Sequence, residues 1–422
     1  MTAEVVIAGG GLAGLTAACH LAEAGTEVRL FERRETLGGR VRTREREGFL
    51  LDRGFQVLFL AYPAARRELD LDALDLRRFD PGATIARPGR RSVLADPFRD
   101  PGSFLRSALN REVTLLDKLR TLRLRAAARR RDPESVLEDD RSIREALRGM
   151  GFSDAFIEHF AAPFYGGITL DRSLADTSAF VFGYTFAMLS RGATAVPAAG
   201  MGAIPAQLAA RAERAGASIR TDSVVSAVSA TEDGATVTAD GEEVAADAAI
   251  VATDPATAHD LTGVEAIPTD ARGCVTQHLA LPRETALEGA RRLLLNPTTE
   301  GPNQVAPLSA VAPEYAPPGR SLLSATYLGS PDGDDAALLA RTRETLDRWY
   351  PERDFGGMEL LDTDRIAFAQ FDQPPGIRDA LPAVDAPGGN VFLAGDYTRW
   401  SSIQGAMASG RDAALAALDR VG

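Results

Sequence analysis

Lysine is almost absent from this chain of 422 residues, in which Lys118 stands alone among 47 basic side chains. Acidic side chains number 59, so the formal net charge is −12. A surface this acidic repels polyanions, and we expect no nucleic-acid partner. The scarcity of lysine also leaves Lys118 as the sole candidate for a catalytic lysine, and its arginine-rich surroundings predict a surface position.

Cysteine, histidine and long apolar runs are scarce as well. The two cysteines, Cys19 and Cys274, lie far apart in the sequence, which predicts no disulfide and fits a reducing compartment. The four histidines show no paired spacing of a metal site. No apolar run free of glycine turns reaches the roughly 18 residues of a membrane span. No lysine or arginine precedes Arg29, so the basic region of a signal peptide is missing. We therefore expect a cytoplasmic protein without a metal.

What the chain does have is a glycine turn near its N-terminus. A buried strand over residues 5–8 leads into Gly9-Gly10-Gly11-Leu12-Ala13-Gly14, and an apolar helix follows from Leu15 to Ala24. In such a turn the first glycine permits the tight bend, the second lets a pyrophosphate approach the backbone, and the third allows close packing of helix on sheet. A second strand ends at Glu32, whose carboxylate can accept hydrogen bonds from ribose hydroxyls. The pattern predicts a dinucleotide site. The alternative is an ordinary glycine turn in a parallel sheet.

Two further motifs extend this site. The first, Leu37-Gly38-Gly39-Arg40, places an arginine after a glycine pair, where it can meet a pyrophosphate. The second is a buried strand that ends at Gly395-Asp396, followed by the start of a helix of small residues at Ile403-Gln404-Gly405-Ala406. An acid at a strand end can accept a bond from a sugar-alcohol hydroxyl, and a helix N-terminus stabilises negative charge.

Together these motifs resemble the FAD-binding enzymes of the flavin amine oxidase and carotenoid desaturase superfamily. The segment from Gly54 to Pro63 and the C-terminal strand Leu393–Thr398 are most similar to plant- and cyanobacterial-type carotene desaturases. Two positions depart from those desaturases: Gln404 stands where glutamate is usual, and Gln56 stands where a histidine is usual. The departures weaken the case for a carotene substrate.

The resemblance implies FAD as the cofactor. The chain offers no cysteine or histidine near the C-terminal motif to tether it, so we expect non-covalent binding. The implied contacts come from the turn, the second strand end, the arginine loop, a central valine and the C-terminal motif: Gly9, Gly11, Leu12, Ala13, Gly14, Glu32, Arg33, Gly38, Gly39, Arg40, Val225, Gly395, Asp396, Gln404, Gly405 and Ala406. No catalytic base is assigned. Candidates for the substrate wall are Gln56, Tyr165, Arg191, Arg399 and Trp400, with Tyr397 and Trp400 as loose candidates for aromatics beside an amine.

The order of segments predicts two interleaved domains and an α/β fold class. A Rossmann-like FAD-binding domain, with a parallel sheet and a β-meander, is expected over residues 1–80, 196–260 and 380–422. An interleaved α+β substrate domain with a helical portion is expected over 81–195 and 261–379. Within it, residues 66–148 show helical rather than strand patterns, including a helix or two over Ser103–Arg131, and residues 152–190 are rich in phenylalanine and tyrosine.

These features predict an FAD-dependent oxidoreductase, first of all a dehydrogenase or desaturase of a hydrophobic, carotenoid- or isoprenoid-like substrate. The electron acceptor is expected to be a quinone or oxygen. Oxidation of an amine or a protoporphyrinogen on the same scaffold is the second hypothesis, and a non-catalytic flavin- or lipid-binding protein is the third. The arginine-rich segment leaves peripheral membrane contact open, and nothing in the sequence sets an oligomeric state.

Overall fold

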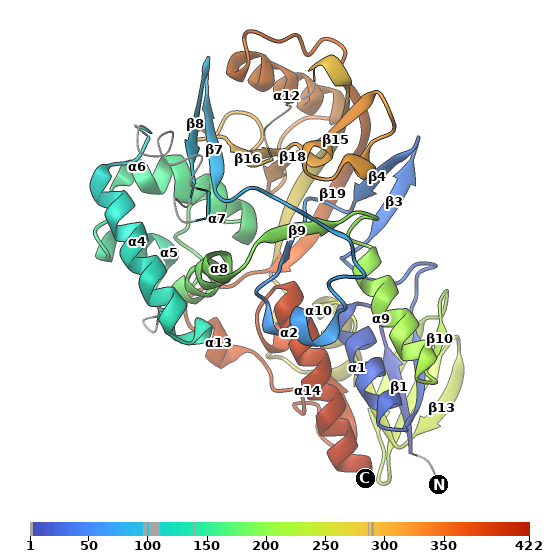
Figure 1. The fold of residues 1–422 in the computed structure, drawn as a ribbon. Coiled ribbons are helices and arrows are strands. Elements are labelled where there is room, and N and C mark those ends of the chain that lie inside the picture. The colour runs from blue at the N-terminus through green and yellow to red at the C-terminus, as the bar shows by residue number, and fades with distance from the viewer. Residues whose placement is uncertain are drawn as a thin grey trace.

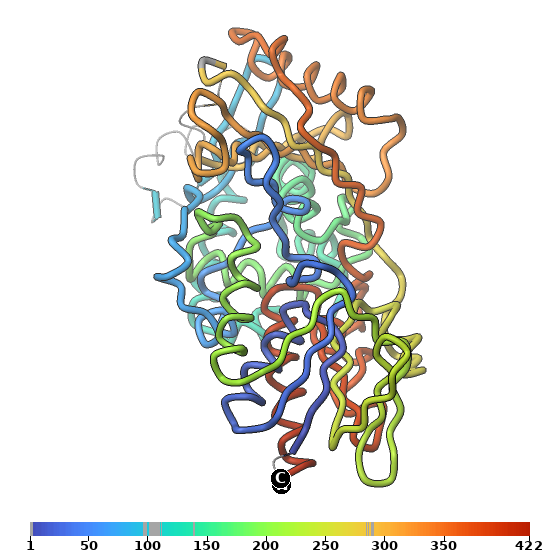
Figure 2. The backbone as a smooth tube through the Cα atoms, turned by 90° about the vertical axis from the view of Figure 1, so that its right-hand side faces the viewer, coloured from blue at the N-terminus to red at the C-terminus, as the bar shows by residue number. Residues whose placement is uncertain are grey.

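A computed structural model of the chain describes residues 3–95, 99–100, 110, 112–137, 140–285, 287 and 291–422. A parallel sheet with its helices forms the lower part of the molecule in Figure 1, a large second sheet forms the upper part, and a group of helices lies at the left. Figures 1 and 2 place both termini at the lower end, beneath the parallel sheet. No helix of the described residues is long and apolar enough to cross a membrane.

The lower sheet is a Rossmann-like sheet of five parallel strands in the order β10-β2-β1-β14-β20. Its strands are β1 (Glu4–Ala8), β2 (Glu27–Phe31), β10 (Ser218–Arg220), β14 (Ala248–Val251) and β20 (Val391–Leu393). Side chains alternate between its two faces, as a strand requires. Val5 and Ile7 therefore pack against the helices, while Val6 packs with Val237 on the opposite face.

Three helices cover one face of this sheet: α1 (Leu12–Glu23), α9 (Ala203–Arg214) and α14 (Ile403–Val421). Helix α1 lies between α9 and α14 and contacts both. Its approach to α14 depends on a glycine, because a Cβ on Gly410 would lie 2.2 Å from the carbonyl oxygen of Ala13. The other face carries an antiparallel meander of β11 (Val225–Ala230), β12 (Ala235–Ala239) and β13 (Glu242–Ala246).

The upper sheet has seven strands in the order β19-β15-β18-β17-β16-β7-β8. All neighbours are antiparallel except β16 and β7. Its strands are β7 (Ala83–Arg87), β8 (Arg90–Leu94), β15 (Ala271–Pro282), β16 (Leu293–Leu295), β17 (Gln304–Ala306), β18 (Arg320–Leu328) and β19 (Glu359–Phe371). Helix α12 (Asp335–Trp349) packs on this sheet, where Leu346 and Trp349 join its apolar cluster.

The helical group at the left of Figure 1 consists of α4, α5, α6, a π-helical turn η3, α7 and α8. Their bounds are Leu115–Arg130, Ile143–Gly149, Asp154–Phe156, Ile157–Ala161, Ala162–Thr169 and Ala179–Arg191. Two small sheets connect the parts: β3 (Thr43–Arg46) with β4 (Phe49–Asp52), and β9 (Thr194–Pro197) between β5 (Leu58–Phe59) and β6 (Leu76–Arg78).

Short helices complete the described chain. They are α2 (Pro63–Glu68), η2 (Pro133–Ser135), α10 (Pro255–Thr262), η4 (Arg283–Thr285), α11 (Leu308–Val311), η5 (Pro313–Tyr315), α13 (Ile377–Ala380) and η6 (Asp396–Thr398).

The predicted α/β class with a Rossmann-like sheet and a meander is confirmed, and one expectation is corrected. Residues 66–148 hold strands β6, β7 and β8 besides helices. The arginines at 77–78, 87 and 90–91 hid these strands, because charged residues within a strand interrupt the apolar alternation that predicts it. The helix expected over Ser103–Arg131 is seen as α4, and residues 103–109 and 111 lie outside the described residues.

The division into two domains stays a proposal. The strands of the parallel sheet fall within 1–80, 196–260 and 380–422, and those of the seven-stranded sheet fall within 81–195 and 261–379. We therefore keep the proposed boundaries.

Gly410→Ala tests the contact between α1 and α14. Helix propensity alone would make alanine more stable by about 1 kcal/mol. The added Cβ must instead displace the Ala13 carbonyl, and overpacking of this kind costs about 1–3 kcal/mol. Thermal unfolding of the variant should therefore show a lower midpoint than that of the parent protein. A raised midpoint would contradict the close approach of the two helices.

Candidate functional site

The glycine turn after β1 is held by the acid at the end of β2. Gly9 adopts a φ of +112°, which side chains rarely tolerate, and a Cβ there would lie 2.5 Å from the Ala252 carbonyl oxygen. The buried Glu32 carboxylate accepts hydrogen bonds from the backbone N–H of Gly10 at 2.8 Å and of Arg34 at 3.0 Å. The carboxylate therefore orients the turn and also faces the space beside it.

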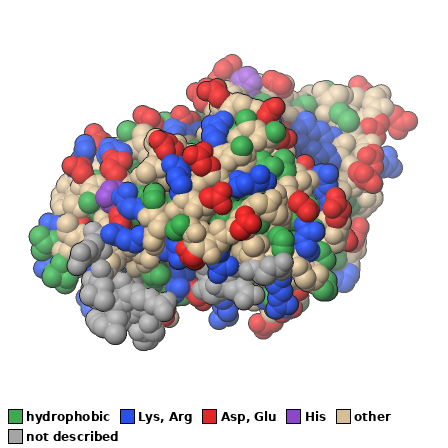
Figure 3. Space-filling model, turned by 90° about the horizontal axis from the view of Figure 1, so that it is seen from above, with side chains coloured by type: hydrophobic (Ala, Val, Ile, Leu, Met, Phe, Trp, Pro, Cys, Tyr) green, Lys and Arg blue, Asp and Glu red, His purple; other side chains and the backbone are tan. Residues whose placement is uncertain are grey.

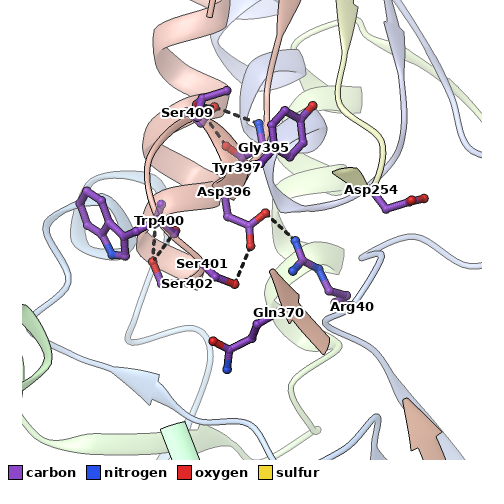
Figure 4. Close-up of polar contacts among 12 residues, drawn as sticks. Arg40, Asp254, Gln370, Gly395, Asp396, Tyr397, Trp400, Ser401, Ser402 and Ser409 are labelled. Atoms are coloured by element: carbon purple, nitrogen blue, oxygen red, sulfur yellow. Dashed lines mark hydrogen bonds and ion pairs between the residues drawn. The ribbon is translucent and has the colours of Figure 1, made fainter. Parts of the chain in front are cut away.

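The second glycine pair lies directly against the first turn. The Gly38 N–H donates to the Gly10 carbonyl oxygen at 2.8 Å, and Gly11 bridges to Gly38. Beyond the loop, Arg40 donates from Nη2 to Asp396 Oδ1 at 2.6 Å (Figure 4). It also donates from Nη1 to the Ala369 carbonyl at 3.2 Å. Burial opposes the charge of Arg40, but the Asp396 carboxylate outweighs burial and raises the pKa of this guanidinium.

Asp396 marks the start of the C-terminal motif. Its second oxygen accepts from Ser401 Oγ at 2.9 Å, as Figure 4 shows. Helix α14 then begins at Ile403, where Ser402 Oγ caps the helix by accepting from the Gly405 N–H at 2.8 Å. The N-terminal and C-terminal motifs therefore meet at one place, with the start of α14 beside the carboxylate.

Most of these groups border one cavity of about 1140 Å³. Thirteen of the sixteen predicted contact residues line it: Gly9, Gly11, Leu12, Ala13, Glu32, Arg33, Gly38, Gly39, Arg40, Val225, Gly395, Asp396 and Ala406. The other three support its wall. Gly14 allows α1 to pass the Gly9 carbonyl, since a Cβ there would lie 2.0 Å from that oxygen. Gln404 accepts from the Ala64 N–H at 2.8 Å, and Gly405 passes the Trp400 carbonyl.

The cavity continues from this polar end into an apolar one. Seven aromatic rings line it in an unbroken series: Phe152, Phe156, Phe160, Phe164, Tyr165, Phe182 and Phe186. Their neighbouring ring centroids lie 4.4–5.8 Å apart. Residues four apart drift by about 40° around an α-helix. The wider π turn at Ile157–Ala161 offsets this drift, so the phenylalanines of α6, η3 and α7 stay on one side.

A buried polar contact fixes the loop between these two ends. The loop at Arg53–Val57 lines the cavity, and its Gly54 N–H donates to Asp364 Oδ2 at 3.0 Å. The fully buried His278 contacts the same oxygen through Nε2 at 3.0 Å. Burial alone would raise the pKa of Asp364, but the bonds from His278 and Gly54 lower it to about 2. The carboxylate is therefore ionised and holds the loop from behind.

Several candidate wall residues are placed elsewhere. Tyr397 is fully buried and donates to the Val251 carbonyl at 3.1 Å, and Trp400 packs in the core against Phe180 and Tyr184. Neither residue lines the cavity. The expectation that these aromatics flank a substrate is wrong, because a strand end followed by a tight helical turn points both rings into the core.

The expectation that Arg191 and Arg399 line the substrate wall is also wrong. Arg191 donates to the Ala128 carbonyl, and Arg399 pairs with Asp412, so both are turned away from the cavity wall. Gln56 and Tyr165 do line it. Lys118, expected at the surface, is half-buried on α4, lines the cavity and donates from Nζ to the Asn110 carbonyl at 2.9 Å. Burial lowers its pKa.

Sequence reasoning missed residues that the upper sheet contributes. Gln304 on β17 and Gln370 on β19 line the cavity, and Gln370 lies beside Arg40 and Asp396 in Figure 4. Gln370 Nε2 donates to the Ile168 carbonyl, while Gln304 Oε1 accepts from Asn303 Nδ2. Single glutamines in strand segments carry no motif, and only the sheet order brings them here.

The residues present fit the FAD that the motifs predict. A Cβ on Gly11 would meet no atom within 4 Å, so open space adjoins the N-terminus of α1. An anion in that space would face unpaired N–H groups and the positive end of the helix. Glu32 on one side supplies hydrogen-bond acceptors, and Arg40 on the other supplies positive charge. The donor and acceptor types thus match a dinucleotide with a free ribose.

Comparisons with known proteins agree with this geometry. The family model for flavin containing amine oxidoreductases matches residues 12–418. The phytoene dehydrogenase of Streptomyces griseus is 30% identical over 261 residues, which cover 55% of this chain and 50% of that protein. The chain spans half or less of the length of the curated relatives it matches first.

Solved structures show the same fold at lower identity. An oxidoreductase from Methanosarcina mazei superposes with a TM-score of 0.74 at 20% identity, covering 99% of this chain and all of that one. Putrescine oxidase bound to putrescine gives a TM-score of 0.72 at 18% identity, with 99% of each chain covered.

Glu32→Ala should weaken FAD retention more than Glu35→Ala. Glu32 is buried in the cavity wall, whereas Glu35 is exposed. Hydrogen bonds to a charged acceptor contribute about 1.5–3 kcal/mol, so loss of the Glu32 carboxylate should weaken binding by about ten- to a hundredfold. The measurement is the flavin released by heating equal amounts of each purified variant. Equal release from both variants would refute this role, and colour retained by the denatured chain would refute non-covalent binding.

Proposed function

The chain belongs to the flavin-containing amine oxidoreductase family and is an FAD-dependent oxidoreductase, and we propose that it dehydrogenates a hydrophobic, carotenoid- or isoprenoid-like substrate. The observation that carries this proposal is the row of seven aromatic rings that continues the cofactor cavity. A wall of this kind buries an apolar chain and offers few polar contacts to a compact charged substrate. The phytoene dehydrogenase relative is consistent with this substrate class.

The residues near the cofactor motifs have roles in binding and orientation. Glu32 would hold ribose hydroxyls, the start of α1 and Arg40 the pyrophosphate, and Asp396 with the start of α14 the flavin end. Val225 would contact the adenine. FAD, when bound, accepts a hydride from the substrate, and the protein places the reacting carbon beside it.

The apolar wall supplies position rather than a proton acceptor. Burial raises the pKa of Tyr165, so its phenol stays neutral and serves as a ring surface. Gln56 donates from Nε2 to the carbonyls of Arg40 and Arg53, which fixes its amide. Gln304 and Gln370, which also line the cavity, carry uncharged amides. We therefore assign no catalytic base.

Amine oxidation is the second candidate, because the putrescine oxidase structure shares the fold. The carboxylates that line the cavity include Glu32, Asp254 and Asp396, and two of these already have cationic partners, Arg33 with Asp254 and Arg40 with Asp396. Tyr397 and Trp400, the aromatic pair expected beside an amine, do not line the cavity. The cavity thus favours the apolar substrate.

A substrate comparison tests the proposal. The FAD-loaded protein is mixed without oxygen with phytoene in detergent, with a protoporphyrinogen, or with putrescine, and loss of the oxidised flavin absorbance is followed. We expect bleaching with the polyene and none with putrescine. Phe160→Asp, which places a carboxylate in the aromatic row, should slow bleaching by the polyene at least about tenfold, because burying a charge there is costly.

A control is Phe355→Leu, which changes an aromatic residue that lies outside the row and does not line the cavity. Its flavin content and bleaching rate should stay close to those of the parent protein. Bleaching by putrescine together with release of hydrogen peroxide in air would replace our proposal with amine oxidation. A flavin that dithionite cannot reduce would indicate a binding protein without activity.

The electron acceptor can be tested separately. We expect oxygen to restore the oxidised absorbance slowly and a soluble quinone to restore it quickly. The physical reason is that cations near the reacting edge favour reduction of oxygen, and Arg191 and Arg399, two of the candidate wall residues, point away from the cavity. Lys118→Met should leave the slow rate unchanged. Rapid oxidation by oxygen that Lys118→Met abolishes would instead assign Lys118 to an oxidase.

A further inference from the structure

One end of helix α4 exposes large apolar side chains to solvent. The exposed fractions are 72% for Leu115, 60% for Leu116 and 48% for Leu119. Among the large apolar side chains that the structure describes, only those of Val224 and Leu415 are also exposed. Helix α4 lies at the left edge of Figure 1, and Figure 3 shows hydrophobic and basic side chains together at that edge.

The fold turns the same face of α4 outward along its length. Asp117, the one acid of α4, is fully buried, where it caps the helix and accepts from Ser153 Oγ at 2.6 Å. At about 100° per residue, Leu115 and Leu119 share a face with Arg123 and Arg130, both exposed. This face therefore presents leucines at one end, arginines beyond them, and no acid.

The leucine end also borders the substrate cavity. Leu115 and Leu119 line it, together with Leu122 from the next turn. A lining residue that is also exposed lies where the cavity meets the surface. The mouth of the cavity is therefore edged by apolar side chains, with cations on the same helix.

We propose that the outer face of α4 docks on an anionic lipid bilayer, with Leu116 and its neighbouring leucines among the acyl chains and Arg123 and Arg130 at the headgroups. Leucines beside arginines on one helix face are the chemistry that recognises such a surface. The formal net charge of the chain is −12, so the attraction is local to this face. A second copy docked through the same face would bring further arginines to a face that has no acid to pair with them, which disfavours self-association.

Docking would open the cavity toward the bilayer. Only the identity of the molecule that enters the cavity, an apolar substrate dissolved in lipid, rests on the proposed function. Attachment to the bilayer needs neither FAD reduction nor a particular substrate, so it can be measured without either.

The test is sedimentation of the FAD-loaded full chain with vesicles of phosphatidylcholine, with or without an equal part of phosphatidylglycerol. The parent protein should sediment with anionic vesicles and stay in solution with neutral ones. The variant Leu116→Glu/Arg123→Glu changes two exposed residues that do not line the cavity. It should lower the partition coefficient by about tenfold or more.

The matched control is Leu415→Glu/Arg420→Glu, which makes the same changes on α14, where Leu415 is 39% exposed. It should sediment like the parent protein. Flavin content and thermal midpoint report whether each variant is folded, and Leu116→Ser serves as a milder version.

Failure of the parent protein to bind anionic vesicles, or equal loss in the control, would overturn the proposal. A dimer in sedimentation equilibrium that Leu116→Glu/Arg123→Glu dissociates would show a second copy on this face instead. Vesicle binding without polyene oxidation would overturn only the proposed substrate.

Discussion

The ion pair between Arg40 and Asp396 is the contact on which the site depends. Its partners are separated by 356 positions in the sequence and lie 2.6 Å apart. One belongs to the loop after the second strand, and the other follows the last strand of the parallel sheet at the start of η6. Asp396 is buried and Arg40 is partly so, and removing either would leave a poorly solvated charge. The pair therefore fixes how the two ends of the chain close around the cofactor space.

The close approaches of small residues make that pair possible. Gly38 fits against Gly10, and Gly410 lets α14 lie on α1. With α14 displaced, the strand end that carries Asp396 would move with it. The glycines thus act through position, since they let two helix starts and two strand ends converge on one volume, where backbone N–H groups can face a phosphate.

The cofactor end of the site could be predicted from sequence because each motif is local. Gly9, Glu32 and Arg40 carry their roles in spacing and residue type, and most of the predicted residues line the cavity. The strands β10 and β12 and the helix α9 also fall close to their expected bounds. The strands β7 and β8 were not predicted, because their arginines hide the alternation. Tyr397 and Trp400 were misplaced, since their orientation depends on packing around η6 rather than on sequence spacing. Gln304 and Gln370 reach the cavity through a sheet order that no local pattern encodes.

The two ends of the cavity place different demands on the surrounding protein. The cofactor end needs fixed polar groups, and the parallel sheet provides them at strand ends and helix starts. The apolar end needs a long smooth wall, which a regular α-helix would not provide because its side chains drift around the axis. The π turn at Ile157–Ala161 offsets that drift, so that Phe156, Phe160 and Phe164 all face the cavity. On the proposed function an apolar molecule must cross the surface at the mouth of the cavity, and this would account for the exposed leucines there.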